Sequence, residues 1–141
     1  MGRVVGIDFG LARFGLAISD QRRIIAQPLC AIRAGKTPLE SAQKIQDALK
    51  SYKEIEEIVL GYPLLLSGKE GTMAVQVKMF KYVLEEQLKL PVILWDERLT
   101  SMQVEKLLKA ASVKRKKRSE LSDALAAATI LHNFLDAQAH I

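Results

Sequence analysis

Short runs of apolar and β-branched residues dominate the first quarter of the chain. The runs at Arg3–Phe9 and Phe14–Ser19 flank a glycine-containing turn, and they predict two strands. A weaker run at Ile24–Ile32 predicts a third strand, which Pro28 limits to an edge or bulged position. Because the connections are short, we expect the three strands to pair antiparallel as a meander.

Apolar residues then recur at helical spacing. Thr37–Glu40 combines an N-cap threonine, a proline at the first helical position and a capping-box glutamate, and it predicts the start of a helix. A second helix is expected from about Thr72 to Lys89, between strands at Glu57–Tyr62 and Val92–Trp95. The buried stripe of the first helix is expected to contain Leu39, Ala42, Ile45, Leu49 and Tyr52.

Two further helices are expected in the last third of the chain. A capping-box pattern at Thr100–Gln103 predicts the first of them, and Ser119 is expected to cap the second, which reaches about Ala137. The two strand–helix–strand units require right-handed crossovers and parallel pairing of the first, fourth and fifth strands. We therefore predict an α/β fold in which helices flank a five-stranded mixed sheet, with residues 1–141 forming a single domain.

Composition indicates the cellular compartment in which we expect the protein. The chain of 141 residues contains one cysteine, Cys30, which excludes an internal disulfide and fits a reducing compartment. No apolar stretch approaches the ~18 residues of a membrane span, and the N-terminus lacks a signal-peptide pattern. We expect a cytoplasmic protein that makes no membrane contact. With His132 and His140 as the only histidines, no zinc-binding spacing is available.

The positive charge of the chain is concentrated in one run. The formal net charge is +5, and five basic residues stand together at Lys114, Arg115, Lys116, Lys117 and Arg118. Without them the remaining basic and acidic residues would balance. Such a patch favours a polyanion partner, although a solvated linker is an equally good interpretation.

Acidic residues stand at the ends of two predicted parallel strands. Asp8 ends the first strand, and Asp96 and Glu97 end the fifth, so the inferred topology brings them to one edge of the sheet. Burying a carboxylate in a central apolar strand is costly, which favours a functional role for Asp8. The alternative is that Asp8 caps the turn at Gly10.

A third acidic residue, Asp123, shares one face of the last helix with Ala126, Ala127 and Ile130. Its side chain is therefore expected to point inward, unless it lies in the first turn and only complements the helix dipole. If Asp8, Asp123 and either Glu97 or Asp96 converge, their oxygens suit Mg²⁺ or Mn²⁺. Two such ions can support phosphodiester hydrolysis.

The turn from Gly10 to Gly15, which contains Arg13, can bind a phosphate or serve as an ordinary hairpin loop. The P-loop and dinucleotide-binding motifs are absent from the sequence.

Together these motifs resemble the YqgF (RuvX-like) family of Holliday-junction-resolvase-like proteins, now regarded as pre-16S rRNA nucleases. The resemblance covers nearly the whole chain and depends on Gly6-Ile7-Asp8-Phe9-Gly10 with Arg13, Gly15 and Ala17; Gly61-Tyr62-Pro63 with Gly68; Asp96-Glu97-Arg98-Leu99-Thr100; and Asp123 with Ala126, Ala127, Ile130 and Leu131. It implies an RNase H-like fold and a bacterial cytoplasmic protein that trims the 5′ end of the 16S rRNA precursor.

The resemblance also implies that Asp8, Glu97 and Asp123 are the catalytic, metal-binding acids. Two segments depart from the family pattern. Leu11 and Ala12 replace a Thr-Lys-like pair, and Leu64–Ser67 replaces a polar loop, so contacts with the substrate are expected to differ.

The leading hypothesis is a nuclease for structured RNA that uses Mg²⁺ or Mn²⁺. The substrate would be precursor rRNA, either free or in pre-ribosomal particles. Its phosphates would be held by Arg13, Arg98 and the Lys114–Arg118 run. The alternatives are a resolvase of branched DNA, which would require a dimer, an ATP-binding relative of the actin-like ATPases, and a ribosome-assembly factor without catalysis. The oligomeric state is left open.

Overall fold

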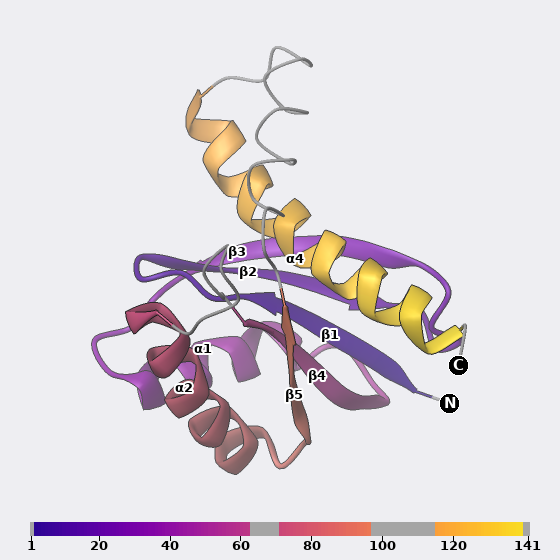
Figure 1. Ribbon diagram of the computed structural model, residues 1–141, viewed down its shortest axis with the longest axis horizontal. Coiled ribbons are helices and arrows are strands. Elements are labelled where there is room, and N and C mark those ends of the chain that lie inside the picture. The colour runs from indigo at the N-terminus through magenta and orange to yellow at the C-terminus, as the bar shows by residue number, and fades with distance from the viewer. Residues whose placement is uncertain (1, 63–70, 97–114, 140–141) are drawn as a thin grey trace.

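The computed structural model describes residues 2–62, 71–96 and 115–139, with only the backbone described for Tyr62 and residues 115–120. Three strands come first, and helices and strands then alternate, so the described elements follow the predicted order (Figure 1). Their bounds are β1 Arg3–Asp8, β2 Arg13–Ser19, β3 Ala26–Arg33, α1 Pro38–Leu49, β4 Ile55–Tyr62, α2 Thr72–Leu88, β5 Val92–Asp96 and α4 Arg115–Ala139.

The five strands form one mixed sheet in the order β3-β2-β1-β4-β5. β1, β2 and β3 pair antiparallel, whereas β1, β4 and β5 run parallel, so the predicted meander and parallel pairing are confirmed. β1 is the central strand. The carboxyl ends of β1, β4 and β5 consequently lie at the same edge of the sheet.

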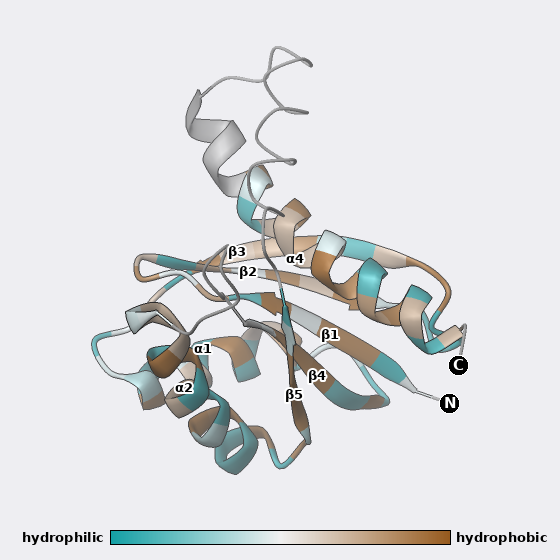
Figure 2. Cartoon of the chain, viewed as in Figure 1, coloured by the Kyte–Doolittle hydropathy of each residue, from teal (hydrophilic) through white to brown (hydrophobic). Residues whose placement is uncertain are grey.

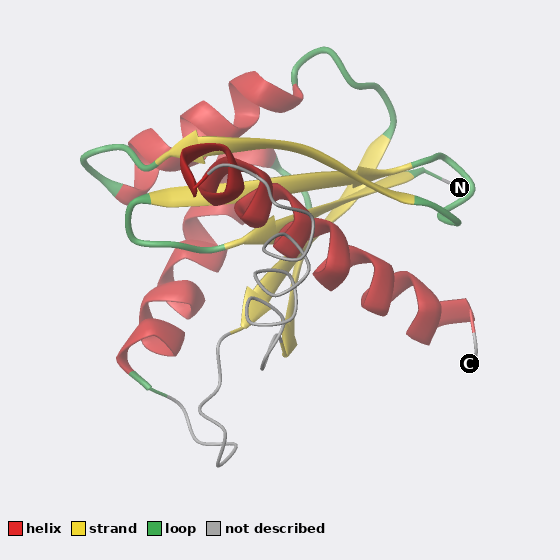
Figure 3. Cartoon of the chain, turned by 90° about the horizontal axis from the view of Figure 1, so that it is seen from above, coloured by secondary structure: helices red, strands yellow, loops and turns green. Residues whose placement is uncertain are grey.

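Helices cover both faces of the sheet. α1 and α2 pack on one face, and α4 crosses the other face (Figures 1 and 3). Hydrophobic residues are concentrated in the strands that the helices cover (Figure 2). The core under α1 and α2 contains Ile7, Leu16 and Leu60, and the core under α4 contains Val4, Ala17 and Val59. Each strand thus divides its side chains between two cores, as strand geometry requires.

The start of α4 differs from the sequence prediction. The described helix already includes Arg115, so Arg115–Arg118 are helical and are not a linker, and Ser119 lies within the helix and is not its N-cap. The physical reason is that lysine and arginine are good helix formers, and neither glycine nor proline interrupts the run. Lys114 and the helix expected from Thr100 lie outside the described residues.

Other boundaries move by smaller amounts. β3 begins at Ala26 because the side chain of Asp20 accepts hydrogen bonds from the backbone N–H groups of Ile24 and Ile25, at 2.7 and 2.9 Å. β4 begins at Ile55, two residues earlier than expected. Leu39, predicted to be buried, is 50% exposed in the first turn of α1.

Among the described residues, no helix is both long and apolar enough to cross a membrane.

Candidate active site

Asp8 is the last residue of the central strand and is half-buried. Val4 and Gly6 precede it at two-residue spacing, and both face α4: Val4 belongs to the core under α4, and a Cβ on Gly6 would lie 2.8 Å from Cβ of Leu131. Side chains alternate along a strand, so Asp8 also points to the α4 face of the sheet.

Gly15 brings a second carboxylate to the same place. It is the β2 residue directly opposite Asp8 in the pairing of β1 with β2. A Cβ on Gly15 would overlap the backbone carbonyl of Asp123 and lie only 3.1 Å from its Cα. The missing side chain therefore lets the backbone of α4 rest on β2, and Asp123 comes next to the end of the strand that carries Asp8.

Asp123 lies eight residues after the start of α4, more than two turns into the helix. A role limited to the dipole of the first turn is therefore excluded. Its side chain is only 24% exposed, as expected from the apolar face on which it stands. Burial raises the pKa of Asp123, and the charge of Arg13 and a hydrogen bond from it partly oppose this increase.

Arg13 forms an ion pair with Asp123, in which its Nε donates to Oδ2 at 2.7 Å. The guanidinium, at the start of β2, is the cation that the structure places on this carboxylate. The sequence predicted a phosphate contact for Arg13 but gave no indication of this pairing, because the two residues are 110 positions apart.

Asp96 lies on the other face of the sheet. In β5, Val92 and Leu94 pack in the core under α1 and α2, whereas Ile93 and Trp95 belong to the core under α4. Asp96 follows in the alternation of Val92 and Leu94, and it is exposed. It therefore points away from the face that carries Asp8 and Asp123.

Several predicted site residues lie outside the part of the chain that the structure describes: Glu97, Arg98 and Lys114. The backbone of Arg115–Arg118 belongs to the turns of α4 that extend beyond the sheet (Figure 1). Within residues 2–62, 71–96 and 115–139, no group of three or more His, Cys, Asp or Glu residues could hold a metal ion. Of the predicted acids that the structure describes, Asp8 and Asp123 lie on the same face at the same strand end, whereas Asp96 does not.

Sequence reasoning missed the role of Gly15, which it assigned to the turn around Arg13. A signal was available, because a glycine directly opposite a strand-end aspartate leaves room for close approach of another backbone.

Comparison with known proteins agrees with this architecture. The model of the family described as "RuvX: Holliday junction resolvase" matches residues 2–137. A protein of Protochlamydia amoebophila is 43% identical over 96% of this chain and 94% of its own length. A Bacillus subtilis protein is 38% identical over 95% and 97%. Both are named "Putative pre-16S rRNA nuclease".

Among solved structures, RuvC of T. thermophilus in complex with a Holliday junction substrate has a similar fold. The TM-score is 0.54 at 18% sequence identity, over 98% of this chain and 96% of that one. A second Thermus thermophilus RuvC structure gives a TM-score of 0.53 over the same shares. The five-stranded mixed sheet with its flanking helices is accordingly an RNase H-like fold, and the chain belongs to the RuvX family.

Proposed function

We propose that this protein is a nuclease that hydrolyses phosphodiester bonds during 5′-end processing of the 16S rRNA precursor in the cytoplasm. The observation that supports the proposal is that Gly15, the residue opposite Asp8, lies against the backbone of Asp123, so that two acids occupy the same part of the α4 face. The name shared by full-length relatives at 38% and 43% identity supports the choice of substrate.

In this proposal Asp8, Glu97 and Asp123 hold Mg²⁺ or Mn²⁺. The residues present fit such an ion, because carboxylate oxygens are the ligands these hard cations prefer. Asp8 and Asp123 also favour a nearby cation, because the side chain of Asp123 is only 24% exposed. The hydrogen bond that Arg13 donates to Asp123 shows that this carboxylate accepts a positive partner. When bound, the ions supply an activated water and stabilise the leaving oxygen.

Arg13 has two roles in this scheme. In the structure its guanidinium neutralises Asp123, and its side chain is still 41% exposed. Arg13 is also placed at the edge of the sheet beside the candidate acids, where its guanidinium could bind a phosphate of the substrate. In this proposal Arg13 therefore stabilises the charge of Asp123 and contributes to phosphate binding.

The remaining phosphate contacts come from Arg98 and from the basic run Lys114, Arg115, Lys116, Lys117 and Arg118. The described part of the run lies in turns of α4 that extend beyond the sheet, which supports contact with phosphates away from the cleaved bond (Figure 1). Such contacts are independent of sequence and fit a structured RNA in a pre-ribosomal particle.

Cleavage assays test the proposal. A precursor 16S rRNA fragment and a four-way DNA junction are incubated with Mn²⁺ and with the wild-type protein, Asp8→Asn, Asp123→Asn or Asp136→Asn. We expect the wild type to cleave the RNA, and Asp8→Asn and Asp123→Asn to lose at least about a hundredfold in rate, since metal ions contribute several kcal/mol of transition-state stabilisation. Asp136→Asn, an exposed position on the same helix, controls for the charge change and should cleave normally.

A resolvase is the second candidate, favoured by the description of the family model. Cleavage of the junction but not of the RNA, with the same loss in Asp8→Asn, would support this candidate. If the wild type cleaves neither substrate, the proposal is wrong, and a binding role without catalysis is favoured.

A further inference from the structure

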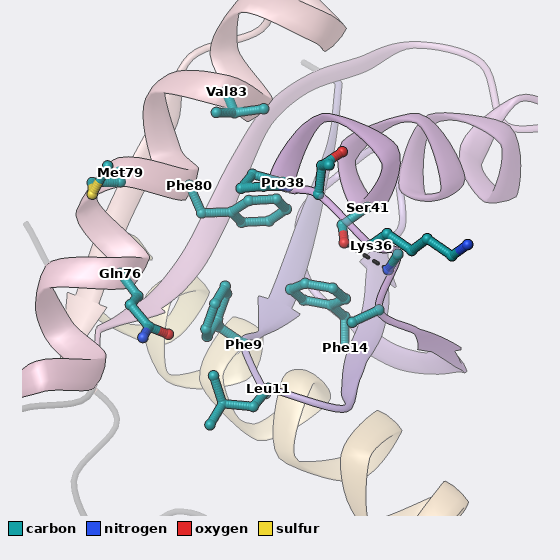
Figure 4. Close-up of a pocket in the computed structure, with 14 residues that line it drawn as sticks. Phe9, Leu11, Phe14, Lys36, Pro38, Ser41, Gln76, Met79, Phe80 and Val83 are labelled. Carbon is teal, nitrogen blue, oxygen red and sulfur yellow. Dashed lines mark hydrogen bonds between the residues drawn. The ribbon is translucent and has the colours of Figure 1, made fainter.

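A cavity of about 430 Å³ opens on the face of the sheet opposite Asp123, at the same end of β1 (Figure 4). Three segments that are distant in sequence enclose it: the turn between β1 and β2, the residues that lead into α1, and one side of α2. Its volume is within the range of small-ligand sites in proteins.

Aromatic side chains line the inner part of the cavity. Phe9, Phe14 and Phe80 pack on one another with ring centroids 5.1–5.5 Å apart. Apolar side chains also remain exposed at its mouth, where Leu11 and Met79 are 69% and 67% exposed. Large apolar groups gathered around a concave site are typical of a surface that binds a partner.

Polar groups stand at the edge of the same cavity. Gln76 of α2 lines it and carries an amide that both donates and accepts hydrogen bonds. Lys36 lines it from the segment before α1 and contributes an exposed positive charge. An apolar interior with an amide and a cation at the edge suits a ligand that combines a flat ring with a negative charge.

The cavity is adjacent to the candidate active site. Phe9 follows Asp8 directly in the chain, but it packs on the core under α1 and α2, so the two side chains point to opposite faces. Gly10, which also lines the cavity, is two residues from Asp8, so their Cα atoms are at most about 7 Å apart. A strand whose phosphate lies at Asp8 therefore has a neighbouring nucleotide within reach of the cavity.

We propose that this cavity binds one unstacked base of the substrate strand, adjacent to the phosphate that is cleaved. The inference rests on the proposed nuclease function, which brings a nucleic acid to Asp8. Proteins that recognise single-stranded segments bind splayed bases on aromatic side chains. Gln76 would contact the edge of the base and Lys36 a phosphate of the same strand.

Abasic substrates test the proposal directly. The nucleotides on either side of the scissile phosphate in a precursor rRNA fragment are replaced one at a time by an abasic nucleotide. We expect one position at which the wild type loses about tenfold in cleavage and in binding, the scale of one base–aromatic contact. Binding is measured with the Asp8→Asn protein, which leaves the RNA intact.

Two variants of α2 provide the matched comparison. Met79→Glu places a carboxylate at the mouth of the cavity, whereas Tyr82→Glu makes the same charge change at a residue that is also 67% exposed but does not line the cavity. We expect Met79→Glu to cleave intact RNA about as slowly as the wild type cleaves abasic RNA. The cleavage rate of Met79→Glu should not fall further when its substrate is abasic. Tyr82→Glu should keep the tenfold difference.

The outcomes separate the two proposals. If the wild type cleaves intact and abasic RNA equally well at every position, the base site is wrong and the nuclease function stands. If Met79→Glu and Tyr82→Glu show the same ratio of cleavage rates on intact and abasic RNA, the base site is also wrong. Binding of an apolar side chain of a protein partner would then be the favoured role of the cavity. If the wild type does not cleave the intact RNA, the nuclease function itself fails.

Discussion

At the scale of single residues, the candidate site depends on a position that has no side chain. Asp8 and Asp123 could be predicted from the sequence, because each is an acid in an apolar strand or helix face. A glycine opposite Asp8 signals room for another backbone, but the sequence could not show that α4 fills this room, since that depends on the path of a helix more than a hundred residues later. The pairing of Arg13 with Asp123 was unpredictable for the same reason.

Which of Asp96 and Glu97 is the functional acid also depends on the direction of a single side chain. The sequence alone could not decide it, because the two alternating sets of β5 are equally apolar. The packing of Ile93 and Trp95 under α4 supplies the missing information, since it places Asp96 on the other face. This packing supports the interpretation that Glu97 is the functional acid.

We therefore predict that Glu97→Ala loses at least about a hundredfold in Mn²⁺-dependent cleavage of the precursor rRNA fragment. Asp96→Ala should cleave at nearly the wild-type rate, because its side chain points away from Asp8 and Asp123. Single-turnover assays with equal amounts of each protein measure the difference. The opposite ranking would make Asp96 the functional acid and refute the assignment by strand alternation.

At the scale of elements, periodicity identified all eight described strands and helices, and the errors fall at their ends. β3 starts late because the carboxylate of Asp20 binds two backbone N–H groups that would otherwise continue the strand. α4 already includes Arg115–Arg118, in agreement with the good helix propensity of lysine and arginine. Such competition between local contacts is not visible in a hydrophobic pattern.

The turn at Asp20 gives a pH-dependent prediction. Hydrogen bonds from backbone N–H groups, with that of Ile25 contributing most, lower the pKa of Asp20 below its usual 3.8. A carboxyl with a lowered pKa in the folded state stabilises the fold above its unfolded pKa, and this contribution is lost as the pH falls through the folded value. The wild type should therefore melt above Asp20→Asn at pH 7, and the difference should shrink below about pH 4.

Thermal unfolding of both proteins between pH 7 and pH 2.5 measures this difference. Asp47→Asn, at an exposed position of α1, controls for the loss of one negative charge. A melting difference between the wild type and Asp20→Asn that stays constant over this pH range would show that the charge of Asp20 does not stabilise the turn.

At the scale of the whole molecule, the sheet separates two candidate sites that meet at the end of β1. The carboxylates lie under α4, and the cavity lies under α1 and α2, with Asp8 and Phe9 as consecutive residues between them. The two strand–helix–strand units made the parallel pairing of β1, β4 and β5 predictable from the sequence. The cavity was not predictable, because it arises where three distant segments pack together.

The electrostatics of the carboxylates link this architecture to stability. Carboxylates that converge repel one another in the folded protein, whereas in the unfolded chain they are far apart. A divalent ion that binds only the folded state stabilises it by RT ln(1 + c/Kd), where c is the free ion concentration. At a hundredfold excess over Kd this is about 2.7 kcal/mol, which raises the melting temperature of a domain of this size by several degrees.

Melting of the wild type and Asp8→Asn, each in EDTA and in Mn²⁺, tests most directly whether the carboxylates form a functional metal site. We predict that Mn²⁺ raises the melting temperature of the wild type by several degrees and that of Asp8→Asn very little. In EDTA, Asp8→Asn should melt close to the wild type, because it removes one of two neighbouring negative charges at nearly constant volume while the Arg13–Asp123 pair is kept. A large loss of stability in EDTA together with an unchanged response to Mn²⁺ would show that Asp8 is structural, and would contradict the account.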